Sequence, residues 1–174
     1  MKHFITLLTG LLVVGILMAQ EKRIDMSGLF LRDANGKQHE ISVLLKSHKM
    51  NLLVFWKLDD GKSCTMLNEL HEAATETLEG MDFQLITIIE TSVSLTQLEY
   101  NYVNANASEA KCFADVNGDL RRHLAITELP YTFLFDSDSH LICSQRGYCV
   151  DAGNQLCEKV RSCLIKMDQA ALKP

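Results

Sequence analysis

The sequence predicts an α/β fold in which a mixed β-sheet is flanked by helices. Two near-continuous apolar runs, 51–56 and 83–89, are typical of central strands that are covered on both faces. Between and after these runs, apolar residues recur at helical spacing. An alternation of strand and helix implies parallel strands joined by crossover helices, and a predicted closing hairpin adds antiparallel strands.

A small hairpin is predicted ahead of the first buried strand. Phe30-Leu31 and Glu40-Ile41 flank the turn Ala34-Asn35-Gly36-Lys37. Asn-Gly readily adopts the left-handed backbone angles that a tight turn requires, so these two short segments are expected to pair. A short helical segment around Ser42–Lys46 leads from the hairpin into the strand Asn51–Trp56.

The longest helix of the first half is predicted from Ser63 to Leu78, and Gly80 ends it. A second helix follows the second strand, and its apolar positions are Leu95, Leu98, Tyr102 and Val103. The remaining predicted elements are strands at Ala110–Ala114, Tyr131–Phe135 and Leu141–Gln145, a brief helix at Leu120–Ala125, and a closing helix with Leu156, Val160, Cys163, Leu164 and Met167 on one face. Each element follows from periodicity and from the turn residues around it.

The first nineteen residues are predicted to be a secretory signal peptide. Met1 to Ala19 has a basic start, a mostly apolar run and a small residue before a polar stretch. The run is shorter than the ~20 residues of a membrane span, so a membrane is expected as a partner only if this segment stays attached. The predicted plan is a signal peptide at 1–19, a short N-terminal segment at 20–27 and one domain at 28–174, in a periplasmic or secreted protein.

Charge and composition exclude several classes of function. Without residues 1–19 the chain has 16 basic and 22 acidic residues, a net charge of −6. A protein that neutralises phosphates needs the opposite sign, so nucleic acid is not an expected partner. The histidines are scattered and neither Cys-x-x-Cys nor His-x-x-x-His spacing occurs, so we expect no metal and no cofactor.

Three segments in this order resemble a known group of proteins. Val54-Phe55-Trp56, followed after ten residues by Leu67-Asn68-Glu69-Leu70, is similar to the strand, active-site turn and first helix of exported thioredoxin relatives of the TlpA-like or ResA-like type. Ile126 to Asp136 resembles their segment that contains a cis-proline, and Leu31 to Lys37 matches their extra N-terminal hairpin. The resemblance covers about residues 28–165 and implies a thioredoxin-like fold in the thiol-disulfide redox superfamily.

The active-site turn departs from that pattern. Where the related proteins carry Trp-Cys-x-x-Cys, this sequence has Asp59-Asp60-Gly61-Lys62-Ser63, which puts Asp60 and Ser63 on the two cysteine positions. Dithiol exchange needs one thiolate to attack and a second to release the mixed disulfide, and a carboxylate and a hydroxyl cannot do this. Asp60 and Ser63 are interpreted instead as helix caps, whose side chains accept hydrogen bonds from free backbone N–H groups.

Cys64 lies one residue beyond the expected position and opens two catalytic hypotheses. It could act as a single exchange thiol in the first turn of the helix, where free N–H groups and nearby Lys62 favour a thiolate, although Asp59 and Asp60 oppose it. The stretch from Phe55 to Thr65 also resembles the peroxiredoxin active site with Cys64 on the peroxidatic position. That peroxidase is the alternative function. Lys57, Gly61 and Pro130 replace the proline, threonine and arginine of the peroxiredoxin pattern.

Pro130 is predicted to follow a cis peptide bond, as the resemblance implies, and to shape a groove beside the active-site turn. The backbone at Leu129 would then pair with an extended peptide, so the expected partners are extended or cysteine-containing exported proteins. Trp56 is predicted either as sheet core or as the edge of this groove. A protein that only binds clients through the groove, without chemistry, remains a further hypothesis, as does a structural module whose cysteines are all paired or inert.

The other cysteines have several possible roles. Six cysteines allow fifteen complete pairings, and spacing alone does not choose among them. A disulfide between Cys149 and Cys157 is a candidate because a short connection separates them. Cys64 could equally be a free cysteine without redox function or part of a structural disulfide, and Cys163 is predicted to be a buried small apolar residue.

Overall fold

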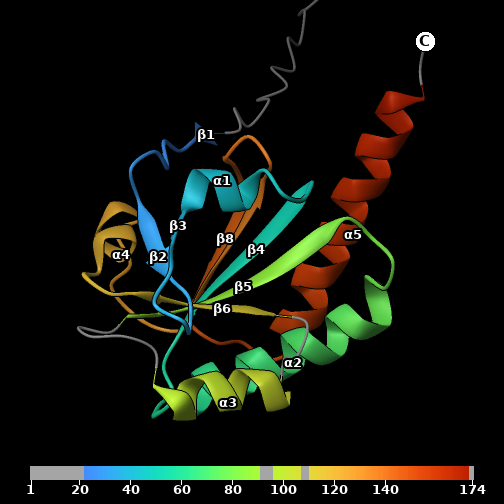
Figure 1. Ribbon diagram of the computed structural model, residues 1–174. Coiled ribbons are helices and arrows are strands. Elements are labelled where there is room, and N and C mark those ends of the chain that lie inside the picture. The colour runs from blue at the N-terminus through green and yellow to red at the C-terminus, as the bar shows by residue number, and fades with distance from the viewer. Residues whose placement is uncertain (1–21, 91–95, 107–109, 173–174) are drawn as a thin grey trace, which may run out of the picture.

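The computed structural model describes residues 22–90, 96–106 and 110–172, and the predicted signal peptide at 1–19 lies outside them. In the described part, an eight-stranded mixed sheet has the order β1-β8-β7-β4-β5-β6-β2-β3 (Figure 1). The strands are β1 Lys22–Arg23, β2 Phe30–Arg32, β3 Gln38–Glu40, β4 Met50–Trp56, β5 Phe83–Glu90, β6 Lys111–Asp115, β7 Tyr131–Asp136 and β8 His140–Arg146. The helices are α1 Ile41–Leu45, α2 Gly61–Thr77, α3 Gln97–Asn106, α4 Asp119–His123 and α5 Ala152–Ala171. The predicted fold class is confirmed.

Strand β4 lies at the centre of the sheet because it is apolar on both faces. It pairs in parallel with β5 and antiparallel with β7, and all seven of its residues are buried. Met50, Leu52, Val54 and Trp56 belong to one apolar core, while Leu53 and Phe55 belong to the other. This alternation follows from the two-residue period of a strand and explains why the run has no polar face.

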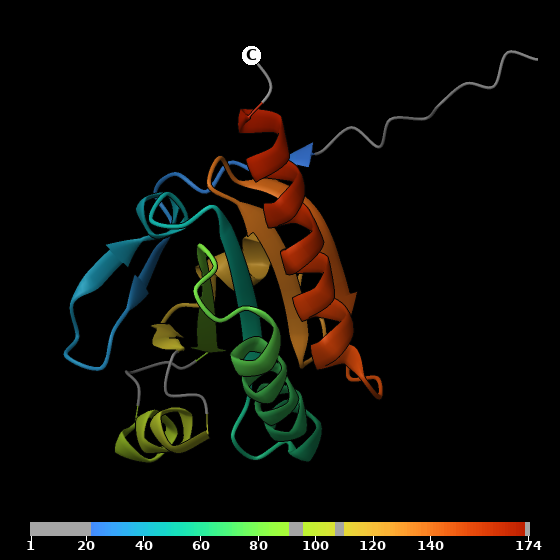
Figure 2. The same ribbon diagram turned by 90° about the vertical axis from the view of Figure 1, so that its right-hand side faces the viewer.

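Helices cover both faces of the sheet. The first core lies under α2 and α5, and α3 adds Val103 to it, whereas the second core lies under α1 and α4. Figure 1 shows α5 and α4 on opposite sides of the sheet, and Figure 2 shows α5 in front of the strands with α2 at its lower end. At Gly153 near the start of α5, an added Cβ would stand 2.7 Å from the Glu69 backbone. A glycine is therefore what allows the two helices to approach so closely.

The predicted hairpin is confirmed, and the N-terminal boundary is corrected. β2 and β3 pair in the expected register, and Gly36 has the left-handed φ of +79° that the turn requires. The sequence predicts a separate short segment at 20–27, of which residues 22–27 are described. Instead, β1 pairs with β8 and Met26 is buried in the second core, so the domain begins before residue 28.

The second predicted helix is present as α3, but one of its apolar positions is wrong. Val103 is buried, whereas Leu98 is 69% exposed. Leu95 lies outside the described residues. Helix α3 packs against the rest of the domain through few residues. Its buried face is therefore narrower than the spacing of its apolar residues predicts. In the part of the chain that the structure describes, no helix is both long enough and apolar enough to cross a membrane.

Candidate functional site

The turn between β4 and α2 is closed by oxygen atoms. Asp60 is the N-cap of α2, and its carboxylate accepts hydrogen bonds from the Ser63 backbone N–H at 3.0 Å and from the Ser63 hydroxyl at 2.6 Å. The interpretation of Asp60 as a cap is confirmed. Ser63 differs from the prediction: its buried hydroxyl donates to the cap instead of accepting from the backbone. The side chains on the two cysteine positions of the resemblance therefore face each other through a hydrogen bond.

Local electrostatics keep the Asp60 carboxylate ionised at neutral pH. The hydrogen bond from the Ser63 side chain is the main cause that lowers the pKa of Asp60 below its ordinary value, and the charge of nearby Lys62 contributes. Lys62 and Gly61 are both exposed, on the first two positions of α2. Asp59 is exposed beside them and pairs with Lys57 at 3.0 Å.

Cys64 is the fourth residue of α2 and is partly exposed. Its backbone N–H already donates to the Asp60 carbonyl at 3.1 Å, so the free N–H groups of the helix belong to the residues before it. Its thiol donates to the Leu58 carbonyl at 3.4 Å. The sulfur therefore lies against the backbone of the turn at Leu58, and the side chain is still partly exposed to solvent.

Tyr102 in α3 is a neighbour of Cys64, although the sequence pattern indicates it only as an apolar position of a helix. Its ring stacks on Trp56, with centroids 5.5 Å apart, and its hydroxyl donates to Asn68 Oδ1 at 3.5 Å. Burial, followed by a hydrogen bond to the Cys64 side chain, raises the pKa of Tyr102 to about 12. No spacing rule connects positions 64 and 102, so only the packed structure reveals this contact.

Pro130 lies beside the turn and follows a cis peptide bond, as predicted. Because β4 and β7 are antiparallel with Phe55 opposite Tyr131, Pro130 lies next to the end of β4. Leu129 is partly buried against the second core, and the Pro130 carbonyl accepts a hydrogen bond from Gly147 at 2.8 Å.

Trp56 is not a groove residue. It is 0% exposed, so the core interpretation holds and the groove interpretation is wrong. The physical reason is that Trp56 continues the even-numbered face of β4, which α2 covers, and Tyr102 stacks on the indole. Within the described residues the indole Nε1 has no hydrogen-bond partner.

The loop before Pro130 carries a charged residue, Glu128, that is paired with β8. Glu128 pairs with Arg146, whose Nε lies 2.5 Å from the carboxylate. Hydrogen bonding to Arg146 is the largest cause that lowers the pKa of Glu128, and the positive charge of Lys62 adds to it. The influence of Lys62 on Glu128 indicates that the start of α2 and the loop before Pro130 lie on the same end of the sheet.

The predicted disulfide between Cys149 and Cys157 is not formed. All six cysteines are free. Cys149 is exposed and accepts a hydrogen bond from Gln145, whereas Cys157 is fully buried with its thiol directed to the Leu70 carbonyl. The short connection brings the two residues close in sequence, but α5 turns Cys157 into the core.

Burial distinguishes the remaining thiols. It raises the pKa of Cys112 to about 11 and that of Cys157 to about 12, and it raises the pKa of Cys143 as well. These three thiols are protonated at neutral pH. Cys163, predicted to be buried, is only partly buried at the edge of the first core.

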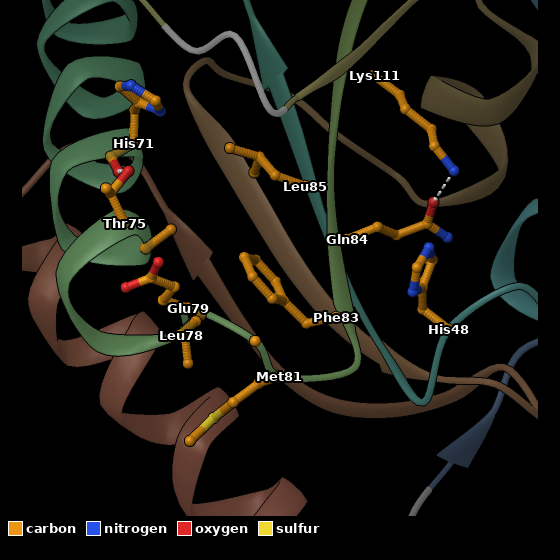
Figure 3. A pocket seen from close by; sticks show the side chains of 12 residues that line it. His48, His71, Thr75, Leu78, Glu79, Met81, Phe83, Gln84, Leu85 and Lys111 are labelled. Atoms are coloured by element: carbon orange, nitrogen blue, oxygen red, sulfur yellow. Dashed lines mark hydrogen bonds between the residues drawn. The ribbon is translucent and has the colours of Figure 1, made fainter.

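A hollow on the described surface lies away from this turn. A cavity of about 520 Å³ lies between the end of α2 and the start of β5, at the other end of α2 from Cys64 (Figure 3). Figure 3 shows Phe83 and Leu85 between the α2 residues on one side of the cavity and His48 on the other. On the side of His48, Lys111 donates a hydrogen bond to Gln84 at 2.8 Å. Among the described residues, no group of three or more acidic, histidine or cysteine side chains could hold a metal ion.

Comparison with solved structures identifies the fold. A thioredoxin-like protein from Porphyromonas gingivalis aligns with a TM-score of 0.64 at 20% identity, covering 82% of this chain and 92% of that one. A secreted Mycobacterium tuberculosis disulfide oxidoreductase aligns with a TM-score of 0.61 at 12% identity, covering 76% and 94%. The bacterioferritin comigratory protein of Xanthomonas campestris, whose structure addresses alkyl peroxide reduction, aligns at 0.60 and 14% identity, covering 77% and 89%.

No family model matches the sequence, and a search of curated proteins finds no match. The domain has a thioredoxin-like fold of the kind seen in thiol-disulfide oxidoreductases, with a hydrogen-bonded Asp60–Ser63 pair in the turn between β4 and α2 and Cys64 next to it.

Proposed function

We propose that this is an exported thioredoxin-fold protein that exchanges thiols and disulfides through the single thiol of Cys64. One observation carries the proposal: Cys64 is a partly exposed thiol at the start of α2, at the same end of the sheet as the cis-proline loop. Cys112, Cys143 and Cys157 are held protonated by burial. Export follows from the predicted signal peptide and agrees with the secreted neighbour of similar fold.

The chemistry of a single thiol differs from that of a dithiol. The Cys64 thiolate attacks one sulfur of a client disulfide, a new S–S bond forms between Cys64 and the client, and the other client sulfur leaves as a thiolate. The turn supplies an Asp60–Ser63 hydrogen bond where a second sulfur would release the client. A second thiol, from the client itself or from a small-molecule thiol, must therefore attack the mixed disulfide and regenerate Cys64.

The proposed client is an extended, cysteine-containing exported chain. A peptide beside Leu129 would lie just before the start of β7, where the Leu129 backbone would supply the main-chain hydrogen bonds, because the Pro130 carbonyl already accepts from Gly147. Binding would place the client sulfur near the start of α2.

The test is trapping of the mixed disulfide. The mature protein is incubated with a peptide carrying an intramolecular disulfide, quenched with acid and analysed by mass spectrometry. We expect a peptide adduct on Cys64 that Cys64→Ser loses completely and that Cys149→Ser, a change at the exposed control thiol, retains. An adduct that persists in Cys64→Ser and disappears in Cys149→Ser would refute the proposal. Peptide binding without any adduct would favour the non-catalytic client-binding hypothesis.

A divergent peroxidase is the second candidate, and the similar fold of the alkyl peroxide-reducing Xanthomonas protein favours it. In that reaction the Cys64 thiolate attacks a peroxide oxygen, giving a sulfenic acid and an alcohol, and two external thiols then restore Cys64. The cations at this end of the sheet do not favour it, because Arg146 is paired with Glu128 and Lys62 lies near Asp60. Cys64-dependent consumption of cumene hydroperoxide with dithiothreitol, faster than that of free cysteine, would promote this candidate over disulfide exchange.

A further inference from the structure

We propose that Tyr102 is a catalytic residue, whose hydroxyl donates a hydrogen bond to the ionised sulfur of Cys64. This role rests on the proposed function of Cys64 as the exchange thiol. Tyr102 lies on α3, thirty-eight positions along the chain from Cys64, and no part of the thioredoxin-like resemblance assigns it a role.

The resting arrangement satisfies the protonated thiol. The Cys64 S–H donates to the Leu58 carbonyl at 3.4 Å, and the Tyr102 hydroxyl donates to Asn68 at the long distance of 3.5 Å. In this state the sulfur needs no donor, and a hydrogen bond to the carbonyl stabilises the neutral thiol over the thiolate.

Ionisation removes the proton that satisfies the Leu58 carbonyl and leaves two acceptors facing each other. The carboxylates of Asp59 and Asp60 on the same turn also oppose a negative sulfur, and the backbone N–H of Cys64 is already used within the helix. On the turn, the Lys62 charge and the start of α2 favour the thiolate. From α3, the Tyr102 hydroxyl lies at Asn68, one turn after Cys64 on α2, and is a donor within reach of the Cys64 side chain.

The position of the Tyr102 ring is independent of the ionisation state. Its ring stacks on Trp56 at an interplanar angle of 28°, and Trp56 is immobilised by complete burial. A rotation about the bond between the ring and the hydroxyl would turn the proton from Asn68 toward the sulfur. The donor is therefore held in place before the thiolate forms, which is the arrangement that makes such hydrogen bonds effective.

The tyrosine serves as a hydrogen-bond donor and keeps its proton. Burial and the neighbouring sulfur raise the pKa of Tyr102 to about 12, so the hydroxyl stays protonated throughout the neutral range. A phenol this weakly acidic does not deliver its proton to a departing thiolate. Its effect is to stabilise the negative charge of the Cys64 thiolate, both when the thiolate forms and when it leaves the mixed disulfide.

The test compares two conservative variants of α3. Tyr102→Phe removes only the hydroxyl and keeps the ring stacking on Trp56, while Tyr100→Phe makes the same change at another partly buried tyrosine of this helix. The rate of Cys64 alkylation by iodoacetamide is followed from pH 5 to 10 by mass spectrometry. We expect Tyr102→Phe to slow alkylation at pH 7 by about tenfold and to move the midpoint of the profile to higher pH, because a hydrogen bond to a charged group is lost. Tyr100→Phe should match the wild type.

A reciprocal measurement uses Cys64→Ser. Without a thiolate beside it, Tyr102 should ionise at a lower pH, although burial still holds its pKa above the ordinary value; the tyrosinate absorbance near 295 nm reports this change.

An unchanged alkylation profile in a folded Tyr102→Phe, as judged by circular dichroism, would overturn the inference. If the profile shifts but the peptide adduct of Cys64 never forms, Tyr102 stabilises the thiolate, but the proposed exchange function fails and the catalytic role of Tyr102 fails with it. If the adduct forms and the profile does not shift, the exchange function stands and the role of Tyr102 fails.

Discussion

Cys64 and Cys157 are the same residue type in two contrasting environments. Each lies on a helix that packs against the first core, and each directs its thiol to a backbone carbonyl, at 3.4 Å for Cys64 and 3.9 Å for Cys157. Cys64 is partly exposed at the start of α2, whereas Cys157 is 0% exposed on α5. Burial is the main cause that raises the pKa of Cys157 to about 12, and the charge of Glu158 adds to it.

The comparison teaches that the position of a thiol relative to the end of the sheet decides whether it can react. A side chain that faces the middle of the sheet from a covering helix loses both solvent access and any stabilisation of its charged form. Cys64 keeps partial access to solvent because it lies in the first turn of α2, next to the turn that follows β4. Three measurements test this difference.

The largest expected effect is in the rates at which the two thiols are labelled. N-ethylmaleimide should modify Cys64 of the native protein at least about a thousandfold faster than Cys157, because Cys157 becomes accessible only when the domain opens. Peptide mapping after timed pulses, with a sample in urea as the fully reactive reference, gives both rates. A labelling rate for Cys157 within tenfold of the rate for Cys64 would contradict the contrast between the two environments.

The next effect concerns the close contact that buries Cys157. Gly153→Ala should lower the free energy of unfolding by about 2–3 kcal/mol, since its Cβ would lie 2.7 Å from the Glu69 backbone and would push α2 and α5 apart. The control is Gly61→Ala, at an exposed glycine where a Cβ meets nothing within 4 Å. Urea unfolding of both variants measures the difference. Equal stability of the two variants would show that the helices adjust without cost.

The smallest effect concerns the turn that presents Cys64. Asp60→Ala should cost about 1 kcal/mol at pH 7 through loss of the N-cap. The pKa of Asp60 is lowered by folding, so its contribution is present above the unfolded value of about 3.9 and is lost as the pH falls through the folded value. The stability difference from wild type should therefore shrink between pH 7 and pH 3.

Urea unfolding at pH 7 and at pH 3 tests this sign. Asp59→Ala is the matched control, since Asp59 is exposed in the same turn and pairs only with Lys57 among the described residues. We expect this control to change stability by less than about 0.5 kcal/mol. A loss for Asp60→Ala that is the same at both pH values would contradict the assignment of its carboxylate as an ionised cap.

Local patterns were sufficient for most of the fold and for the outline of the site. The strand Asn51–Trp56 and the turn at Gly36 depend on near neighbours in the sequence, and the structure has both. The cap at Asp60 and the cis bond before Pro130 were also predictable, the first from helix-start chemistry and the second from the family resemblance.

What the sequence determined by itself was the order of elements, the hydrogen-bonded turn and the absence of a second cysteine beside Cys64. The tertiary structure decided that Tyr102 touches Cys64, that Trp56 lies in the core, that Leu98 faces solvent, and that Cys149 and Cys157 lie apart. The physical reason is the distance along the chain over which each effect acts. Periodicity and capping act over a few residues, whereas burial and contact between side chains depend on which helix covers which part of the sheet.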